Sequence, residues 1–212
     1  MKCLLGKKVG MSRVFRGENA IPVTLLSAGP CFVTQIRTND QDGYSAVQLS
    51  YGQKKKISQP LAGHLKKAKV ASAQFIHEFK VDNASDYKLG QEIKAAIFSA
   101  GDELTISALS KGKGFMGVVK RHGFHGAPAT HGHKHDHRAP GSIGSGFPEH
   151  VFKGMRMGGR TGHGRVTIKN IEVIDVDAGK NLLAVKGAVP GARNTLVEIQ
   201  SIASGESEKK ES

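Results

Sequence analysis

The sequence predicts a mainly β protein: a small barrel with a small α+β part and one long, glycine-rich, basic excursion. Short apolar runs recur near both ends of the chain, separated by turn residues, a pattern typical of small β-barrels. Residues 111–165 break this pattern and hold 14 of the 27 glycines. Long loops inside compact domains are uncommon and are usually functional or disordered. We therefore treat this stretch separately from the body.

In the first part of the chain, apolar and polar residues alternate, which places one face of a strand on a core and the other in water. The expected strands are residues 4–5, 9–15, 21–26, 32–36 and 44–51. Glycine-containing turns separate them, with a hairpin loop expected between the last two strands. We assign residues 1–51 to the barrel body.

The middle of the chain, residues 52–97, has a different texture and is expected to be a small α+β insertion. A short helix is expected over residues 60–71, with Leu61, Leu65 and Ala68 on one side. Further short strands are expected at residues 75–81 and 92–98.

Strand patterning then resumes on both sides of the glycine-rich stretch. Residues 98–110 contain one alternating strand at 104–109, and residues 166–203 contain strands at 166–174, 182–185 and 196–199. We assign both ranges to the barrel body. Residues 204–212 are polar and low in complexity, so a disordered tail is expected.

Charge and composition set residues 111–165 apart from the rest. The chain has a formal net charge of +13, and this stretch contributes ten lysines and arginines against only Asp136 and Glu149. It also carries 8 of the 10 histidines and few large apolar residues. Such a segment loses much backbone entropy on ordering and buries little apolar surface in return. A partner with negative charge is needed, and nucleic acid is the obvious candidate.

The sequence gives little support for a disulfide-rich, secreted or membrane protein. Cys3 and Cys31 are too few for a disulfide scaffold and lack CxxC spacing, so we expect reduced thiols in a cytosolic protein. No apolar run is long enough for a signal peptide or a membrane span, and no membrane partner is expected.

Three chemical signals within the stretch compete with nucleic-acid binding. Residues 112–117 match the GxGxxG dinucleotide fingerprint, but residues 118–123 are a poor helix start with an early glycine. The alternating histidines of residues 131–137 could bind zinc or nickel, although Lys134 and Arg138 add repulsive charge. Neighbouring cations favour ionised carboxylates at Asp136 and Glu149 over a proton-donating acid, so no catalytic residue is expected.

Phosphate contact is the remaining interpretation. The cations are interleaved with glycine and phenylalanine instead of forming one block, and arginine can both bridge phosphates and stack on bases. Histidines in a cationic loop serve equally well as hydrogen-bond donors or stacking surfaces for RNA. The basic run at residues 54–56 is either solvated surface or a further RNA contact.

Several motifs, in order from residue 6 to about residue 199, resemble the bacterial form of the ribosomal protein L3 family of the large subunit. They are Gly6–Phe15, Ser110–Phe115, Gly117–Phe124, His137–Gly144, Val151–Gly154, Met157–Gly159, Arg165–Thr167 and Asn181–Gly191. In some bacterial relatives a glutamine shortly after the Gly-Ser-Ile-Gly run is methylated. Here residues 145–150 contain no glutamine, so we expect that modification to be absent.

This resemblance implies a translation-protein-type β-barrel whose extension penetrates the large subunit toward the peptidyl-transferase centre. It further implies a non-enzymatic cytoplasmic protein in the ribosome, which binds large-subunit rRNA near its 3′ end, acts early in assembly and neighbours large-subunit proteins fourteen and nineteen. No cofactor or small-molecule substrate is expected. The residues expected to contact rRNA are Lys7, Lys8, Arg13, Lys111, Lys113, Lys120, Arg121, His131, His137, Arg138, Lys153, Arg156, Arg160 and Arg165. The alternative is a histidine-rich metal-binding protein or metal-dependent enzyme using His131, His133, His135 and His137, although no metal site is expected on the preferred reading.

Overall fold

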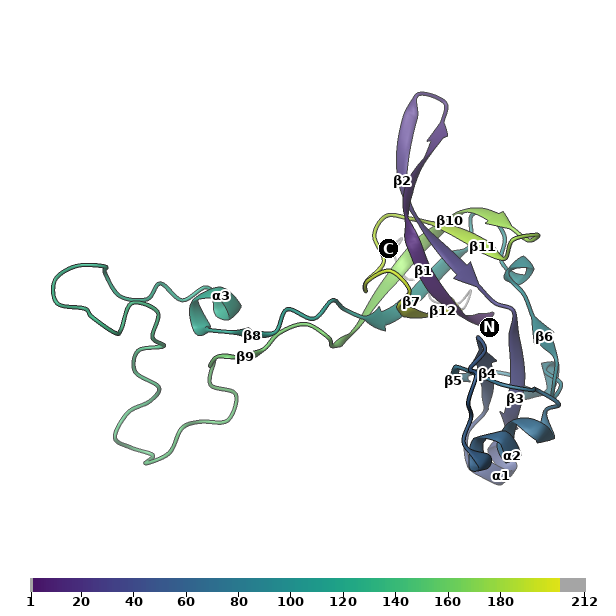
Figure 1. The fold of residues 1–212 in the computed structure, drawn as a ribbon, viewed down its shortest axis with the longest axis horizontal. Coiled ribbons are helices and arrows are strands. Elements are labelled where there is room, and N and C mark those ends of the chain that lie inside the picture. Colours follow the sequence, from purple (N-terminus) through teal and green to yellow (C-terminus); the bar gives the residue numbers. More distant parts are fainter. Residues whose placement is uncertain (1, 203–212) are drawn as a thin grey trace, which may run out of the picture. The chain divides into compact units, whose positions relative to one another are not determined.

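Six antiparallel strands close into a barrel in the order β1-β12-β7-β10-β11-β2 in the computed structural model, which describes residues 2–202 (Figure 1). The barrel strands are β1 (Cys3–Arg16), β2 (Asn19–Ala28), β7 (Glu103–Leu109), β10 (Arg165–Asp177), β11 (Leu182–Lys186) and β12 (Leu196–Ser201). The mainly β prediction is confirmed. Residue 203 and the expected tail at 204–212 lie outside the described residues.

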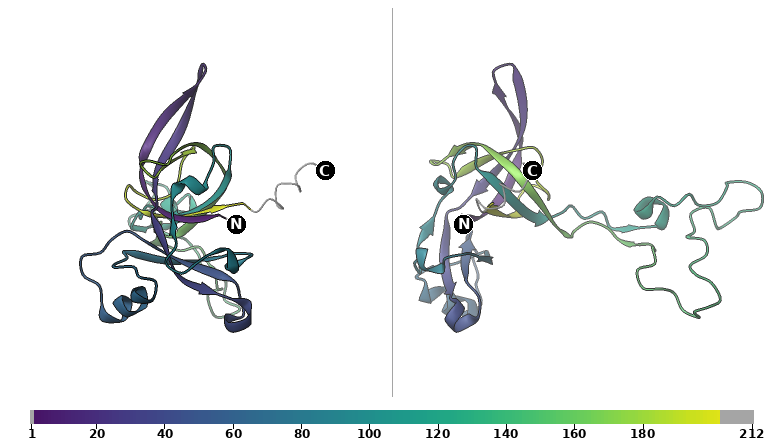
Figure 2. Two further views of the ribbon diagram at one scale, coloured as in Figure 1. Left: turned by 90° about the vertical axis from the view of Figure 1, so that its right-hand side faces the viewer. Right: turned by 180° about the vertical axis from the view of Figure 1, so that it is seen from behind.

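The barrel holds together because alternate residues of its strands meet inside it. Leu4, Leu26, Ile106, Leu183 and Ile199 are fully buried and come from five different strands. Burying one such side chain contributes roughly 1.5–3 kcal/mol. β1 includes both of the strands expected at residues 4–5 and 9–15. Its pairing with β2 is irregular between Lys8 and Gly10. Figure 2 shows the far ends of β1 and β2 continuing past the barrel as a two-stranded ribbon.

A second sheet has the strand order β5-β4-β3-β6. Its strands are β3 (Cys31–Arg37), β4 (Ala46–Tyr51), β5 (Phe75–Lys80) and β6 (Glu92–Ile93). The assignment of residues 31–51 to the barrel is therefore wrong. After the turn at Gly29-Pro30, β3 pairs with β4 and β6, and within residues 2–202 it pairs with no barrel strand. Its buried side chains, such as Val33, join the same apolar core as those of the barrel.

Short helices complete this part of the chain. They are α1 (Asn39–Asp42), α2 (Gln59–Lys67), and the 3-10 turns η1 (Ala84–Asp86) and η2 (Ala95–Ile97). The expected helix is present, with Leu65 and Ala68 buried, but it ends at Lys67 and does not extend to residue 71. The strand expected over residues 92–98 is wrong beyond Ile93. Ala95 and Phe98 are both buried, and a 3-10 turn brings residues three apart to the same side.

Both cysteines are free and buried. The Cys31 Sγ donates a hydrogen bond to the Leu5 carbonyl oxygen at 3.4 Å, and burial raises the pKa of the Cys31 thiol to about 12. Burial likewise raises the pKa of the Cys3 thiol. Within residues 2–202, no helix has the length and apolar character needed to cross a membrane.

The chain divides into two compact units. Residues 2–109 and 165–202 form the first, which we call the body, and residues 110–164 form the second, which we call the extension. β7 leads out of the body and β10 leads back into it, and these two strands pair with each other from Arg165 and Leu109 onward.

Candidate nucleic-acid interface

The base of the extension is a narrow two-stranded ladder. The backbone N–H of Ser110 bonds the Gly164 carbonyl oxygen at 2.9 Å, and the Lys113 N–H bonds the Thr161 carbonyl oxygen at 2.9 Å. β8 (Phe115–Met116) then pairs with β9 (Gly159–Arg160). Gly162 has φ +73°, and a Cβ there would overlap the Lys111 carbonyl oxygen. Glycine is therefore required for the two arms to approach so closely.

A single helical turn, α3 (Val118–His122), follows β8 and ends at Gly123, which is in the left-handed conformation. Arg121 Nη1 donates to the Met157 carbonyl oxygen at 2.9 Å, and His122 Nε2 lies 3.0 Å from the same oxygen. These contacts attach α3 to the returning arm. The GxGxxG residues 112–117 lie in the ladder and include β8, so they do not form the phosphate-binding turn of a dinucleotide fold.

Beyond α3, residues 124–158 have no regular secondary structure. Their backbone hydrogen bonds include those from Ala127 to His137 and from Met155 to Phe152, at 3.2 and 3.3 Å. Among the described residues of the extension, Val118 is the single buried apolar side chain, while Phe115 and Phe147 are 79% and 86% exposed. Burial this small cannot offset the backbone entropy lost on ordering, so the extension needs a partner to fix its conformation.

The cations of the extension are exposed and unpaired by carboxylates. Among the described residues, none of its lysines or arginines takes part in a salt bridge. The sequence-predicted cations in this group are Lys111, Lys113, Lys120, Arg121, Arg138, Lys153, Arg156 and Arg160. Lys134, which the sequence motifs do not single out, is exposed in the same way. Each of these charges is available to an anionic partner.

The predicted site residues of the body behave differently. Lys8 Nζ donates to the carbonyl oxygens of Val189 and Gly191 at 2.6 and 3.3 Å, and Lys7 Nζ donates to Gln74 Oε1 at 2.8 Å. Arg165 is paired with Glu198. Arg13 is exposed, with its guanidinium carbon 5.6 Å from the centroid of the Phe15 ring. The partners of Lys7, Lys8 and Arg165 are far away in the sequence, so no local pattern could have indicated them.

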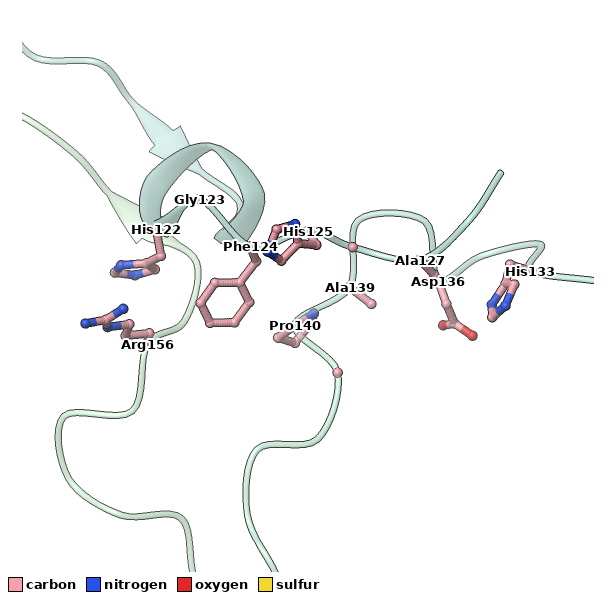
Figure 3. A pocket seen from close by; sticks show the side chains of 12 residues that line it. His122, Gly123, Phe124, His125, Ala127, His133, Asp136, Ala139, Pro140 and Arg156 are labelled. Atoms are coloured by element: carbon pink, nitrogen blue, oxygen red, sulfur yellow. The ribbon is translucent and has the colours of Figure 1, made fainter. Parts of the chain in front are cut away.

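Within the extension, an open hollow of about 780 Å³ gathers aromatic and cationic groups. Figure 3 shows the His122 ring and the Arg156 guanidinium close together, with the Phe124 ring beside them. His125, His133 and Asp136 line the rest of the hollow. Flat rings next to a guanidinium form a surface that suits stacked bases and phosphate oxygens.

The predicted histidines do not build a metal centre in the part of the chain that the structure describes. No group of three or more histidine, cysteine or carboxylate side chains converges in residues 2–202. His131, His133 and His135 are exposed and His137 is half-buried. The metal-binding alternative thus gains no support from the arrangement.

A β-barrel body that carries a cationic extension unable to bury its own apolar groups defines a structural nucleic-acid-binding protein. Residues 45–182 match the family described as Ribosomal protein L3. The chain is 50% identical over 205 residues to the "Large ribosomal subunit protein uL3" of Pelotomaculum thermopropionicum, covering 95% of this chain and 97% of the relative. The protein of the same name from Thermosipho africanus is 48% identical over 206 residues, covering 97% and 100%. A third, from Desulforudis audaxviator, is 49% identical over 207 residues, covering 96% and 97%. This chain belongs to the ribosomal protein L3 family, for which RNA binding is typical.

Proposed function

We propose that this chain is a structural constituent of the large ribosomal subunit in the bacterial cytoplasm, where it binds large-subunit rRNA. The observation that carries this proposal is the contrast in charge pairing. Cations of the extension face solvent without carboxylate partners, whereas Arg165, where the chain returns to the body, is paired with Glu198. Membership of the ribosomal protein L3 family supports the same conclusion.

In physical terms, the extension binds by neutralising phosphates and by filling spaces in folded RNA. Each lysine or arginine that meets a phosphate releases condensed counterions, so the affinity for isolated rRNA falls steeply with salt. Glycine lets the backbone approach RNA closely, and the exposed rings of Phe147 and Phe152 offer surfaces for stacking on unpaired bases. The extension and the RNA around it then stabilise each other's conformation.

The finer parts of the proposal follow the family resemblance. The body is a translation-protein-type barrel, and the extension supports the RNA around the peptidyl-transferase centre without taking part in chemistry. The binding region lies near the 3′ end of the large-subunit rRNA, the protein acts early in subunit assembly, and its neighbours are large-subunit proteins fourteen and nineteen. The predicted contact residues of the extension carry the binding, while Lys8 and Arg165 act mainly within the body.

Sedimentation tests the proposal directly. The full-length protein should sediment with the large subunit in a cell extract and remain there after a wash in high salt, because contacts buried in folded RNA are screened less than surface charges. Recovery of the protein in the ribosome-free fraction under low-salt conditions would contradict it. Elemental analysis of the same untagged protein tests the metal-binding alternative independently.

A further inference from the structure

The body contains a second cationic segment that the extension does not explain. Between Asp42 and Glu78 the sequence contains no carboxylate. This segment holds six exposed lysines: Lys54, Lys55, Lys56, Lys66, Lys67 and Lys69. Among the described residues, none of the six forms a salt bridge. Exposed, unpaired positive charge concentrated in one segment of a stably folded unit indicates an anionic partner.

Helix α2 fixes part of this segment in place. Leu65 is fully buried, and His64 Nε2 lies 2.6 Å from Gln48 Oε1 on β4. Lys66 and Lys67 therefore project from an anchored helix, and Lys69 follows in the turn after it. In Figure 1, α2 lies near β3, which agrees with the residue contacts between them.

A hollow of about 660 Å³ lies entirely within the body, and of these six lysines Lys69 lines it. Phe32, Tyr51 and Val70 contribute apolar lining, and Lys7 and Lys69 bring positive charge to it. Lys7 is held by its bond to Gln74, with Nζ 5.4 Å from the centroid of the Phe75 ring. Pockets of roughly 300–1,000 Å³ with mostly apolar lining and a few polar groups are typical of sites for small organic groups.

A peptide cannot be added as a strand to β3, whose Phe32 lines the hollow. The nearby edge of β3 is already occupied, since Gly90 N–H bonds the Val33 carbonyl oxygen at 2.8 Å and Val33 N–H bonds the Gln91 carbonyl oxygen at 3.0 Å. Strand addition requires a free edge. A nucleotide needs none, because its flat base can enter an apolar slot while its phosphate meets a lysine at the rim.

We propose that this hollow receives one unstacked nucleotide of large-subunit rRNA, with the base against Phe32 and Val70 and the adjoining phosphates on Lys69 and its neighbouring lysines. The inference rests on the proposed function and deepens it, because it gives the body an RNA site of its own. The extension would then supply most of the electrostatic binding, while the body recognises a particular unpaired base. Single-stranded bases that are splayed out are the usual targets of specific RNA recognition.

Site-specific photocrosslinking in the assembled large subunit tests this. Leu89 lines the hollow and is 51% exposed, so Leu89→p-benzoylphenylalanine places a photoreactive group at its rim. We expect irradiation to join residue 89 to a single rRNA nucleotide, mapped by the stop in reverse transcription. Adding Lys69→Glu should lower the crosslink yield by roughly tenfold, because it replaces a phosphate contact by a repulsive charge. Lys80→Glu, an exposed lysine on β5 that does not line the hollow, should leave the yield unchanged.

The other outcomes overturn the proposal in distinguishable ways. A crosslink to a neighbouring protein would show that a peptide occupies the hollow. No crosslink from a protein that sediments with the subunit would show that the hollow faces solvent there. If the protein fails to sediment with the subunit at all, the proposed function is wrong, and the nucleotide site falls with it.

Discussion

Arg165, the first residue of β10, donates a hydrogen bond from Nη2 to Oε2 of Glu198 on β12. His77 Nε2 lies 3.3 Å from the same carboxylate oxygen, and the Glu198 side chain is only 15% exposed. Where the chain returns from the extension, the charge of Arg165 is therefore paired with a carboxylate of the body. From Ser110 to Gly164, in contrast, the described cations have no carboxylate partner.

Arg165→Ala should therefore affect the stability of the body, and Arg160→Ala should affect RNA binding. We expect Arg165→Ala to lower the free energy of unfolding by at most about 1 kcal/mol, as for other exposed ion pairs, and to leave the salt dependence of RNA binding nearly unchanged. Arg160→Ala should leave unfolding unchanged and reduce the slope of log affinity against log salt by about 0.7–0.9. Urea unfolding and filter binding to deproteinised large-subunit rRNA measure both. Equal slopes for the two variants would refute the distinction.

Gly162 offers a test of the ladder at the base of the extension. Gly162→Ala places a Cβ against the Lys111 carbonyl oxygen and forces alanine into a left-handed conformation, which costs roughly 1–2 kcal/mol before any overlap is relieved. We expect faster hydrogen exchange at the amides of Lys113 and Thr161, weaker binding to rRNA and an unchanged melting temperature of the body.

Gly164→Ala is the matched control, because a Cβ at Gly164 meets nothing within 4 Å. It should behave as the parent protein in all three measurements. If the two variants protect those amides equally, the close approach at Gly162 is not what holds the two arms together.

The buried thiol of Cys31 predicts a pH effect. Its pKa in the folded protein is about 12 against an ordinary value of 9.0, because burial penalises the thiolate. The folded-state pKa is raised, so its contribution to stability is complete below pH 9 and is lost as the pH rises toward 12. At pH 9 we expect native Cys31 to react with iodoacetamide far more slowly than in urea, where the thiol is half ionised. Equal rates in the two conditions would show that the site is open.

Local pattern was enough to predict much of the body. The helix around Leu65 and the strand ending at Leu109 are predicted by the spacing of apolar residues that lie close together in the sequence. Residues far away in the sequence decide which sheet a strand joins. For that reason the sequence pattern places residues 31–51 in the barrel, whereas they belong to the four-stranded sheet. The short turn η2 is not predicted from the sequence, because the apolar residues Ile93 and Ala95 alternate with Lys94 as they would in a strand.

The candidate interface shows the same limit. The clustering of glycine and positive charge in the extension is visible in the sequence, since it depends on composition alone. Whether a given cation is free depends on contacts across the fold, such as Lys8 with the carbonyl oxygen of Val189. The absence of carboxylates between Asp42 and Glu78 also marks the lysine-rich segment in the sequence. The hollow lined by Lys69 could not be predicted, because its lining comes from segments that are far apart in the sequence.

The salt dependence of rRNA binding, measured after removal of residues 125–160, tests most directly whether the unpaired cations of the extension carry the binding. This deletion removes five cations, Lys134, Arg138, Lys153, Arg156 and Arg160, and spares the apolar core of the body. A control variant neutralises five cations that are paired in the body, Lys2, Arg16, Arg37, Lys180 and Lys186. We expect the deletion to leave a folded, soluble body and to weaken binding sharply. The slope of log affinity against log salt should flatten by roughly 3.5–4.5, at about 0.7–0.9 for each phosphate-binding cation removed. The control variant should keep the slope of the parent protein. An affinity and slope unchanged by the deletion would contradict this account.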